Sequence, residues 1–385
     1  MHRGWHFLQI PGPSNTPDRI LKAMSSPTID HRGPEFGELS LSILKDVKSI
    51  FQTIGNVVIY PSSGTGAWEA ALMNLYQPGD EILAFETGYF SDLWHNLAQK
   101  IGLNVEYIES DWRRGVEANK IAEALRKDTD HSIKGVMVVH NETSTGVTSD
   151  IPAIRNAIDD CKHPALLLVD VVSSLGTTPF DQDKWGVDVA ICASQKGFML
   201  PPGLAFNSVN EKALKLAQNN SSLNSYWQWD RIIEMNRNGY YPYTPASNLL
   251  FGLRESLDMI LEEGLSNLFD RHRKLAMAAR KAAEAWGLEN QCTNTEEYSD
   301  STTALIVPDQ KADRLRKIVL EELNMSLGTG LGKLKGEVFR IGHLGDFNEL
   351  MLCATLSGVE MGLSRAGITH KKGGVQAAMD YLNTN

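Results

Sequence analysis

The sequence predicts an α/β fold in which a large domain with a mainly parallel sheet is followed by a smaller α+β domain. Between about residues 38 and 260, short apolar segments of strand length alternate with segments of helical spacing. Continuous apolar strands between helices are typical of a parallel sheet covered on both faces. After about residue 260, long helical segments dominate and only two or three strand-like segments remain. We therefore expect an N-terminal arm over residues 1–20, a large domain over 21–260 and a small domain over 261–385.

The composition is that of an ordinary globular protein. Of the 385 residues, 42% are hydrophobic and 22% are charged, which excludes a disordered, collagen-like or coiled-coil chain. The 37 Lys and Arg residues and 47 Asp and Glu residues give a net charge of −10. This acidic balance argues against a nucleic-acid-binding protein, which usually carries a basic stripe.

The four cysteines, Cys161, Cys192, Cys292 and Cys353, form no CxxC pair. We therefore expect neither a metal site nor a disulfide framework, and free thiols suit a reducing cytosol. The first residues have no apolar core of signal-peptide length, and no apolar run approaches the roughly 18 residues of a membrane span. The expectation is a cytoplasmic protein that does not contact a membrane.

The elements are predicted in order from apolar runs and helical spacing. Residues 10–15 are expected to be extended, because their prolines fix φ and lack an amide donor. The large domain is expected to contain strands at 57–60, 81–85, 135–140, 166–170, 187–193 and 204–207, and helices at 66–76, 93–101 and 151–160. The small domain is expected to contain strands at 303–307 and 338–341, and helices at 267–286, 312–323 and 348–366.

Ligands of parallel sheets bind at the carboxyl ends of strands, so polar residues that follow predicted strands are the functional candidates. The first candidate is the turn over residues 61–67, which contains Ser63, Gly64, Thr65 and Gly66. Backbone amides at a helix N-terminus bind phosphate well, although a plain tight turn has the same composition. The turn matches neither a P-loop nor the dinucleotide-binding glycine motif.

Two charged residues and one polar loop also follow predicted strands. Asp170 ends an apolar strand, where it could hold a metal, a ribose hydroxyl or a protonated ring nitrogen, or simply cap a helix. Lys196 follows an apolar strand among small residues; burial there would lower its pKa and suit a Schiff-base lysine, whereas a surface turn would not. The loop over residues 140–146 alone proves nothing.

Together these features match the needs of pyridoxal 5'-phosphate. Its phosphate would bind at the helix N-terminus, and Asp170 would keep the pyridine nitrogen protonated so that the ring can accept electrons. Lys196 would bind the cofactor covalently. The order of the three features on one sheet is more specific than any of them alone.

At this point the sequence resembles the class V, fold-type I, pyridoxal-phosphate-dependent aminotransferases, and among them the alanine/serine–glyoxylate aminotransferase family. The resemblance covers nearly the whole chain, from the motif at residues 11–15 to the one at 339–342, and five motifs agree in order. It implies a mainly parallel sheet of the seven-stranded type. It also implies an enzyme that moves an amino group between small amino and keto acids.

The resemblance gives a role to each matching residue. It implies that Lys196 carries the cofactor, that Asp170 pairs with the pyridine nitrogen, and that the phosphate turn is Ser63, Gly64, Thr65 and Gly66. It further implies that Gln195, Thr143 and Phe90 contact the cofactor, and that Tyr241 and Thr244 contact the phosphate bound by the neighbouring subunit. Arg340 is implied to bind the substrate carboxylate, with Pro13 and Asn15 also at the substrate. Taken alone, Phe90 also fits a core aromatic, Arg340 a structural ion pair and Tyr241 surface packing.

Two residues depart from the pattern of some relatives: Thr65 stands where they have His, and Phe90 where they have Trp. Both substitutions keep a hydrogen-bond donor or an aromatic face, but they leave the contacts open. The segments 28–36 and 197–203 resemble the serine–glyoxylate branch of the family. We therefore expect a ping-pong transamination from serine, or alanine, to glyoxylate.

The next interpretation is that the protein is an aspartate–glyoxylate aminotransferase. It needs a second cation, which His31 and Arg32 could supply if their loop folds over the site rather than staying solvated. A cysteine desulfurase comes after it, but neither Cys292 nor Cys353 lies in a Gly/Ser-rich loop. A binding protein that has lost its cofactor is the remaining alternative. If Tyr241 and Thr244 serve a neighbour's cofactor, the active unit is a homodimer.

Overall fold

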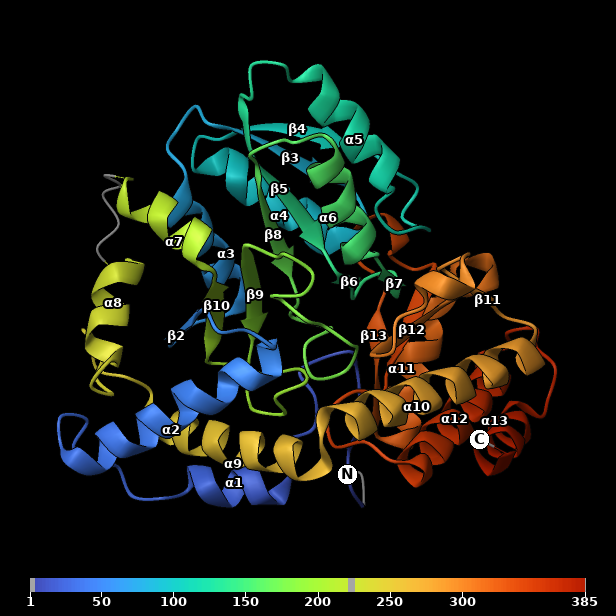
Figure 1. Cartoon of the computed structure of the whole chain (residues 1–385). Helices are drawn as coiled ribbons and strands as arrows, with labels where there is room; N and C mark the ends of the chain where they lie inside the picture. Colours follow the sequence, from blue (N-terminus) through green and yellow to red (C-terminus); the bar gives the residue numbers. More distant parts are fainter. Residues whose placement is uncertain (1–3, 221–225, 385) are drawn as a thin grey trace.

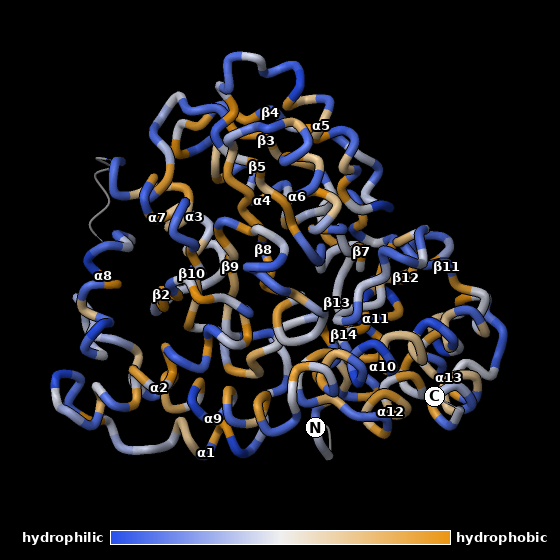
Figure 2. The backbone as a smooth tube through the Cα atoms, viewed as in Figure 1, coloured by the Kyte–Doolittle hydropathy of each residue, from blue (hydrophilic) through white to orange (hydrophobic). Residues whose placement is uncertain are grey.

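The computed structural model describes residues 4–220 and 226–384 (Figure 1). Residues 1–3 of the expected N-terminal arm lie outside the described residues. Figure 2 shows hydrophobic residues concentrated along the central strands. Two large clusters of buried side chains form the core, one that includes these strands and one in the C-terminal part.

A seven-stranded sheet forms the centre of the larger part of the molecule, with the order β2-β10-β9-β8-β5-β3-β4. All of its neighbouring strands pair in parallel except β10, which is antiparallel to both β2 and β9. The strands are β2 (Asn56–Tyr60), β3 (Glu81–Phe85), β4 (Asn104–Ile108), β5 (Ile133–Val139), β8 (Leu166–Asp170), β9 (Val189–Ala193) and β10 (Ala205–Val209). The expected mainly parallel α/β fold is confirmed.

Helices and short elements surround this sheet. Helix α3 packs on β9 and β10, α4 packs on β3, β4 and β5, and α5 packs against α6. Helices α1 and α2 pack against α9 at the base of Figure 1. The bounds are α1 (Asp18–Met24), α2 (Pro34–Phe51), α3 (Gly64–Leu75), α4 (Tyr89–Lys100), α5 (Ala118–Lys127), α6 (Ile151–Asp160), α7 (Glu211–Gln218), α8 (Trp229–Asn236) and α9 (Ser247–Glu263), with the hairpin β6 (Asn141–Glu142) and β7 (Val147–Thr148).

The C-terminal part is built on a five-stranded sheet with the order β1-β13-β14-β12-β11. Its edge strand β1 (Phe7–Gln9) comes from the N-terminus and pairs in parallel with β13. The other elements are α10 (Leu265–Trp286), β11 (Glu289–Asn290), β12 (Thr302–Ile306), α11 (Ala312–Leu323), β13 (Met325–Thr329), β14 (Val338–Gly342), α12 (Glu349–Arg365) and α13 (Gly374–Thr384), with 3-10 turns at Thr295–Glu297, Pro308–Gln310 and Gly332–Leu334. Helix α10 contributes buried residues to both clusters, so it runs along both parts of the chain.

The structure differs from the sequence prediction at several elements. Helix α1 begins at Asp18, inside the range expected for the arm, and residue 260 lies within α9 rather than between elements. Strand β5 ends at Val139, so His140 belongs to the following loop. Strand β4 was not predicted, because this edge strand alternates exposed and partly buried residues instead of forming an apolar run.

Over the described ranges, every helix is either too short or too polar to cross a membrane. The domain boundaries at residues 20 and 260 stay a prediction.

Candidate active site

A cavity of about 220 Å³ lies at the carboxyl ends of the central strands, beside the N-terminal end of α3. This is the position at which parallel sheets bind ligands. The residues that line it are Gly12, Pro13, Ser63, Gly64, Thr65, Trp68, Phe90, Val139, Asn141, Thr143, Asp170, Val172, Ser173, Gln195, Lys196 and Pro202. Nine of the predicted site residues are in this set.

Asp170 is the last residue of β8 and is buried. One carboxylate oxygen accepts a hydrogen bond from the indole Nε1 of Trp68 at 2.7 Å, and the other accepts from the amide of Val172 at 2.8 Å. Burial raises the pKa of Asp170 to about 7, against the opposing effect of these hydrogen bonds. A fixed and desolvated carboxylate of this kind suits a cationic partner, which would favour its charged form.

Lys196 follows β9 and is also buried. Its ammonium donates a hydrogen bond to the carbonyl of Pro11, so the extended N-terminal segment covers the lysine. Burial lowers the pKa of Lys196 to about 7, with a further contribution from the charge of Arg340. Gly12 makes this approach possible: it has a φ of +100°, and a Cβ there would lie 2.4 Å from Lys196 Cδ. An amine with a pKa near neutrality is partly unprotonated, as a nucleophile or base must be.

The N-terminal end of α3 faces the cavity with small residues. Ser63 is the N-cap, and its side chain makes no capping hydrogen bond to the helix. Gly64 lies close to the loop after β8, since a Cβ there would make a tight contact of 3.2 Å with Val172 Cγ2. The amides of a first helical turn have no acceptor within the helix and attract anions. The turn can therefore hold a phosphate group.

The loop after β5 joins the cavity to the C-terminal sheet. Thr143 shares a hydrogen bond between its hydroxyl and that of Ser173, and its carbonyl accepts from Arg340 Nη1 at 2.8 Å. Arg340 Nε donates to the carbonyl of Thr329 at 2.8 Å. Among the described residues no protein acceptor is found for Arg340 Nη2. The guanidinium is thus fixed at two nitrogens and keeps a third for an anionic group.

Three further predicted residues line the cavity: Pro13, Phe90 and Gln195. Phe90 lies in the first turn of α4, and its amide donates to the carboxylate of Glu142 at 3.2 Å. The side-chain Oε1 of Gln195 is buried and has no hydrogen-bond partner within the described chain. A buried acceptor without a donor is costly, so this oxygen is ready for a ligand.

Seven predicted site residues, Arg340 among them, lie outside the lining of this cavity, and their roles stay predictions. Gly66 is partly buried, and a Cβ there would lie 2.1 Å from Ser62 Oγ; the side-chain amide of Asn15 donates to the carbonyl of Leu8 at 3.1 Å. The remaining four are distributed elsewhere in the same chain. His31 and Thr244 line a second cavity of about 310 Å³, Tyr241 is a buried core residue, and Arg32 is exposed.

Sequence reasoning missed three residues at the site. Trp68 lies on α3 and binds Asp170, Ser173 follows β8 and binds Thr143, and the buried carboxylate of Glu142 accepts from the first amides of α4. Trp68 follows the phosphate turn by one helical turn, and this spacing could have indicated a residue directed at the same site. Ser173 and Glu142 carry no comparable signal, since Ser and Glu are common in loops.

The residues fit pyridoxal 5'-phosphate on observations of the structure alone. The first turn of α3 offers amides for the phosphate, Asp170 offers a carboxylate for the ring nitrogen, and Lys196 offers a partly neutral amine in the same cavity. The unpartnered oxygen of Gln195 lies in the same cavity. The fold and this site define a pyridoxal-phosphate-dependent enzyme of fold-type I.

Comparison with known proteins identifies the family. The model of the class V aminotransferases matches residues 6–332 of this chain. The chain belongs to the class V aminotransferase family, and it is a pyridoxal-phosphate-dependent aminotransferase.

Individual relatives are similar over their whole length. A serine–glyoxylate aminotransferase from Methylorubrum extorquens is 47% identical, with 99% of this chain and 97% of the relative covered. An L-aspartate–glyoxylate aminotransferase from Paracoccus denitrificans is 44% identical, with 97% and 95% covered. The crystal structure of ureidoglycine–glyoxylate aminotransferase from Bacillus subtilis superimposes with a TM-score of 0.91 at 26% identity, and each chain is covered completely.

Proposed function

We propose that the protein transfers the amino group of serine, and also of alanine, to glyoxylate by a ping-pong mechanism. Serine would leave as hydroxypyruvate, and glyoxylate would leave as glycine. The 47% identity to a serine–glyoxylate aminotransferase supports this donor. The structural observation that carries the proposal is the charge of the cavity: among its described lining residues, Lys196 is the only cation. A donor with a small neutral side chain suits this environment.

Arg340 would bind the α-carboxylate of the donor. Its guanidinium is oriented by the carbonyls of Thr329 and Thr143, and Thr143 itself lines the cavity. Burial lowers the pKa of Arg340 to about 10, which still leaves it charged at neutral pH. A buried charge of fixed geometry binds a planar carboxylate strongly and in one orientation.

Lys196 would act as general base and then as general acid at the donor's Cα. Its lowered pKa places the amine near the value at which both proton removal and proton return are efficient. When bound, pyridoxal phosphate supplies an electron-withdrawing ring that makes this Cα proton acidic. Asp170 would hold the ring nitrogen, while Trp68 and the amide of Val172 fix the direction of the carboxylate.

A homodimer with shared sites is part of the proposal. Tyr241 and Thr244 do not line the Lys196 cavity of their own chain, which is expected of residues that complete a partner's site. His31 lines the same second cavity as Thr244, and its Nε2 is buried without a partner in the described chain. An active monomer in size-exclusion chromatography would contradict this part of the proposal.

Aspartate–glyoxylate transamination is the second candidate, favoured by the 44% identity to such an enzyme. It requires a second cation for the side-chain carboxylate of the donor. Within one chain, His31 and Arg32 do not line the Lys196 cavity, so they could act only on a partner's site. Serine therefore remains the favoured donor.

The positions of all four thiols argue against a cysteine desulfurase. Cys192 and Cys292 are buried, Cys161 and Cys353 are partly buried, and none of them lines the cavity. Burial raises the pKa of Cys292 to about 11, which disfavours the reactive thiolate. We also propose the reducing cytoplasm as the compartment, because it suits four unpaired cysteines.

The decisive experiment is the absorbance spectrum of the purified holoenzyme, mixed in turn with serine, alanine and aspartate without a keto acid. Conversion to the spectrum of the aminated cofactor by serine supports the proposal, and conversion by aspartate alone supports the second candidate. A yellow protein that reacts with no donor would overturn both. In parallel, Lys196→Ala should lose turnover, and after borohydride treatment its intact mass should show no bound cofactor, unlike the wild type.

A further inference from the structure

The arginine proposed to bind substrate sits on a hairpin whose tip lies on the larger part of the molecule. Thr329 ends β13, Arg340 lies in β14, and the two strands pair with Gly328 opposite Arg340. Because Arg340 Nε donates to the Thr329 carbonyl within the same hairpin, the guanidinium moves with the hairpin. Whatever holds the hairpin in place therefore also sets the position of Arg340.

The tip of this hairpin is the 3-10 turn Gly332–Leu334, which contacts the segment between β3 and α5. Gly332 has a φ of +53°, and a Cβ there would lie 2.8 Å from Trp112 Cη2 and 3.1 Å from Tyr89 Cδ2. Trp112 is buried in a small cluster with Ala304, Leu334 and Val338 of the C-terminal part. The tip thus packs against the rings of Trp112 and Tyr89.

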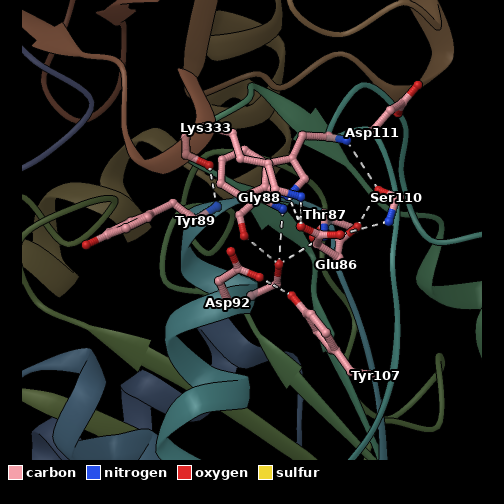
Figure 3. Close-up of polar contacts among 12 residues, drawn as sticks. Glu86, Thr87, Gly88, Tyr89, Asp92, Tyr107, Ser110, Asp111 and Lys333 are labelled. Atoms are coloured by element: carbon pink, nitrogen blue, oxygen red, sulfur yellow. Dashed lines mark hydrogen bonds and ion pairs between the residues drawn. The ribbon is translucent and has the colours of Figure 1, made fainter. Parts of the chain in front are cut away.

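An ion pair between Lys333 and Glu86 adds to this contact (Figure 3). The ammonium of Lys333 donates to Oε1 of Glu86 and lies 5.2 Å from the centre of the Trp112 ring. The Glu86 side chain is only 4% exposed, whereas that of Lys333 is 60% exposed. Trp112 Nε1 donates to Glu86 Oε1 at 2.8 Å, and the amide of Ser110 donates to Oε2 at 3.0 Å.

The electrostatics of Glu86 depend on this lysine. Burial raises the pKa of Glu86, but hydrogen bonds from Lys333, Ser110 and Trp112 outweigh it and leave the pKa below its usual value. Among the ion pairs of the described residues, Lys333 is the only cation paired with Glu86. An exposed ion pair usually contributes little, but removing the partner of a buried carboxylate leaves an uncompensated charge.

Glu86 directly precedes the turn that begins α4 and leads to the cavity. The amide of Tyr89 donates to Ser144 Oγ at 2.9 Å, and the rings of Tyr89 and Phe90 meet edge to face at 5.7 Å. Phe90 lines the cavity. The tip of the β13–β14 hairpin therefore contacts the short segment that contains Phe90. Arg340 lies in a strand of the same hairpin.

We propose that Lys333 is a positioning residue for the reaction: through Glu86 and Trp112 it holds the β13–β14 hairpin against the start of α4, and so fixes Arg340 relative to Phe90 and the cofactor cavity. The proposal rests on the proposed function, in which Arg340 binds the α-carboxylate of the donor. Lys333 does not line the cavity. It acts through the carbonyl of Thr329.

The test compares three variants of the holoenzyme. Lys333→Met removes the charge but keeps a stem of similar length, Lys333→Arg keeps the charge, and Lys335→Met changes an exposed lysine of the same loop that has no ion-pair partner in the described chain. We expect Lys333→Met to raise the KM for the amino donor about fivefold with kcat changed less than about twofold, because donor binding is affected before chemistry. Lys333→Arg should restore most of the KM, and Lys335→Met should match the wild type.

Hydrogen–deuterium exchange without any donor supplies a readout that is independent of activity. Amides of residues 325–342 should exchange faster in Lys333→Met than in the wild type or Lys335→Met. Unchanged exchange, or an unchanged donor KM, in Lys333→Met would overturn the proposal. If the wild type reacts with none of serine, alanine and aspartate, the proposed function fails and the role of Lys333 fails with it; if the wild type reacts and Lys333→Met matches it, only the role of Lys333 fails.

Discussion

The indole Nε1 of Trp68 donates a hydrogen bond to the carboxylate of Asp170 at 2.7 Å, and both residues are buried. Trp68 lies on α3, whose first turn faces the cavity with Ser63, Gly64 and Thr65. One helix therefore carries both the turn proposed to bind the phosphate and the indole that orients the carboxylate at the end of β8. The distance between the first turn of α3 and the carboxylate of Asp170 is therefore set by the rigid helix α3.

The first prediction concerns this hydrogen bond. Trp68→Phe keeps an aromatic ring but removes the donor to Asp170, and a hydrogen bond to a charged group is worth about 1.5–3 kcal/mol. We expect kcat/KM to fall at least about tenfold, measured in the donor half-reaction. The matched control is Trp94→Phe: Trp94 stacks on Trp68 at 5.8 Å, but its own Nε1 has no partner in the described chain. Equal losses in both variants would count against a specific role of Trp68.

A second prediction concerns substrate binding by Arg340. Arg340→Lys cannot reproduce the planar fork held by the carbonyls of Thr329 and Thr143. The KM for the amino donor should rise about tenfold or more, as steady-state kinetics at fixed glyoxylate would show. Arg316→Lys serves as the control, because Arg316 also donates to a carbonyl of β13, that of Leu327 at 3.0 Å, but its second partner is Asp313, whereas that of Arg340 is Thr143 of the cavity lining. A wild-type KM in Arg340→Lys would refute the assignment.

A third prediction uses the close approach of Gly12 to Lys196. Gly12→Ala would put a methyl group 2.4 Å from Lys196 Cδ and so displace the lysine or the N-terminal segment that covers it. We expect activity to fall by about two orders of magnitude or more, since small displacements at a reacting group are costly. Gly373→Ala is the control: Gly373 has a nearly equal φ of +102° but open space around it. The control bears the same backbone strain, so comparable losses in activity would point to strain alone.

The fourth prediction is a pH dependence of stability in the cofactor-free protein. Burial lowers the pKa of Lys196 from 10.5 to about 7, so folding requires loss of a proton between these values. The cost to stability is complete below about pH 7 and disappears as the pH rises toward 10.5. Lys196→Met should therefore unfold at a higher temperature than the wild type at pH 7, and the difference should shrink up to pH 10.

Thermal unfolding of both cofactor-free proteins across this pH range measures the effect. Lys335→Met, which changes an exposed lysine, should follow the wild-type curve at every pH. A difference between Lys196→Met and the wild type that stays constant from pH 7 to 10 would show that packing, not proton linkage, is responsible.

Much of the central fold could be predicted because its strands are buried on both faces. Strands β3 and β8 and helices α6 and α11 have the predicted bounds, since apolar runs and helical spacing are strong local signals. Strand β4 was missed because an edge strand needs no continuous apolar run. Strand β1 was missed because its pairing with β13, more than 300 residues away, leaves no local pattern.

The sequence by itself predicted the chemistry proposed for the site: the small-residue turn and Lys196 follow recognisable strands, Asp170 ends one, and parallel strands bring their carboxyl ends together. Only the tertiary structure decided which groups support that chemistry. These contacts join distant segments: the hydrogen bond from Trp68 to Asp170, the hydrogen bond from Lys196 to the Pro11 carbonyl, and the ion pair of Lys333 with Glu86. The physical reason is that periodicity reports which face of an element is buried, whereas a hydrogen-bond partner is fixed only when two elements pack against each other.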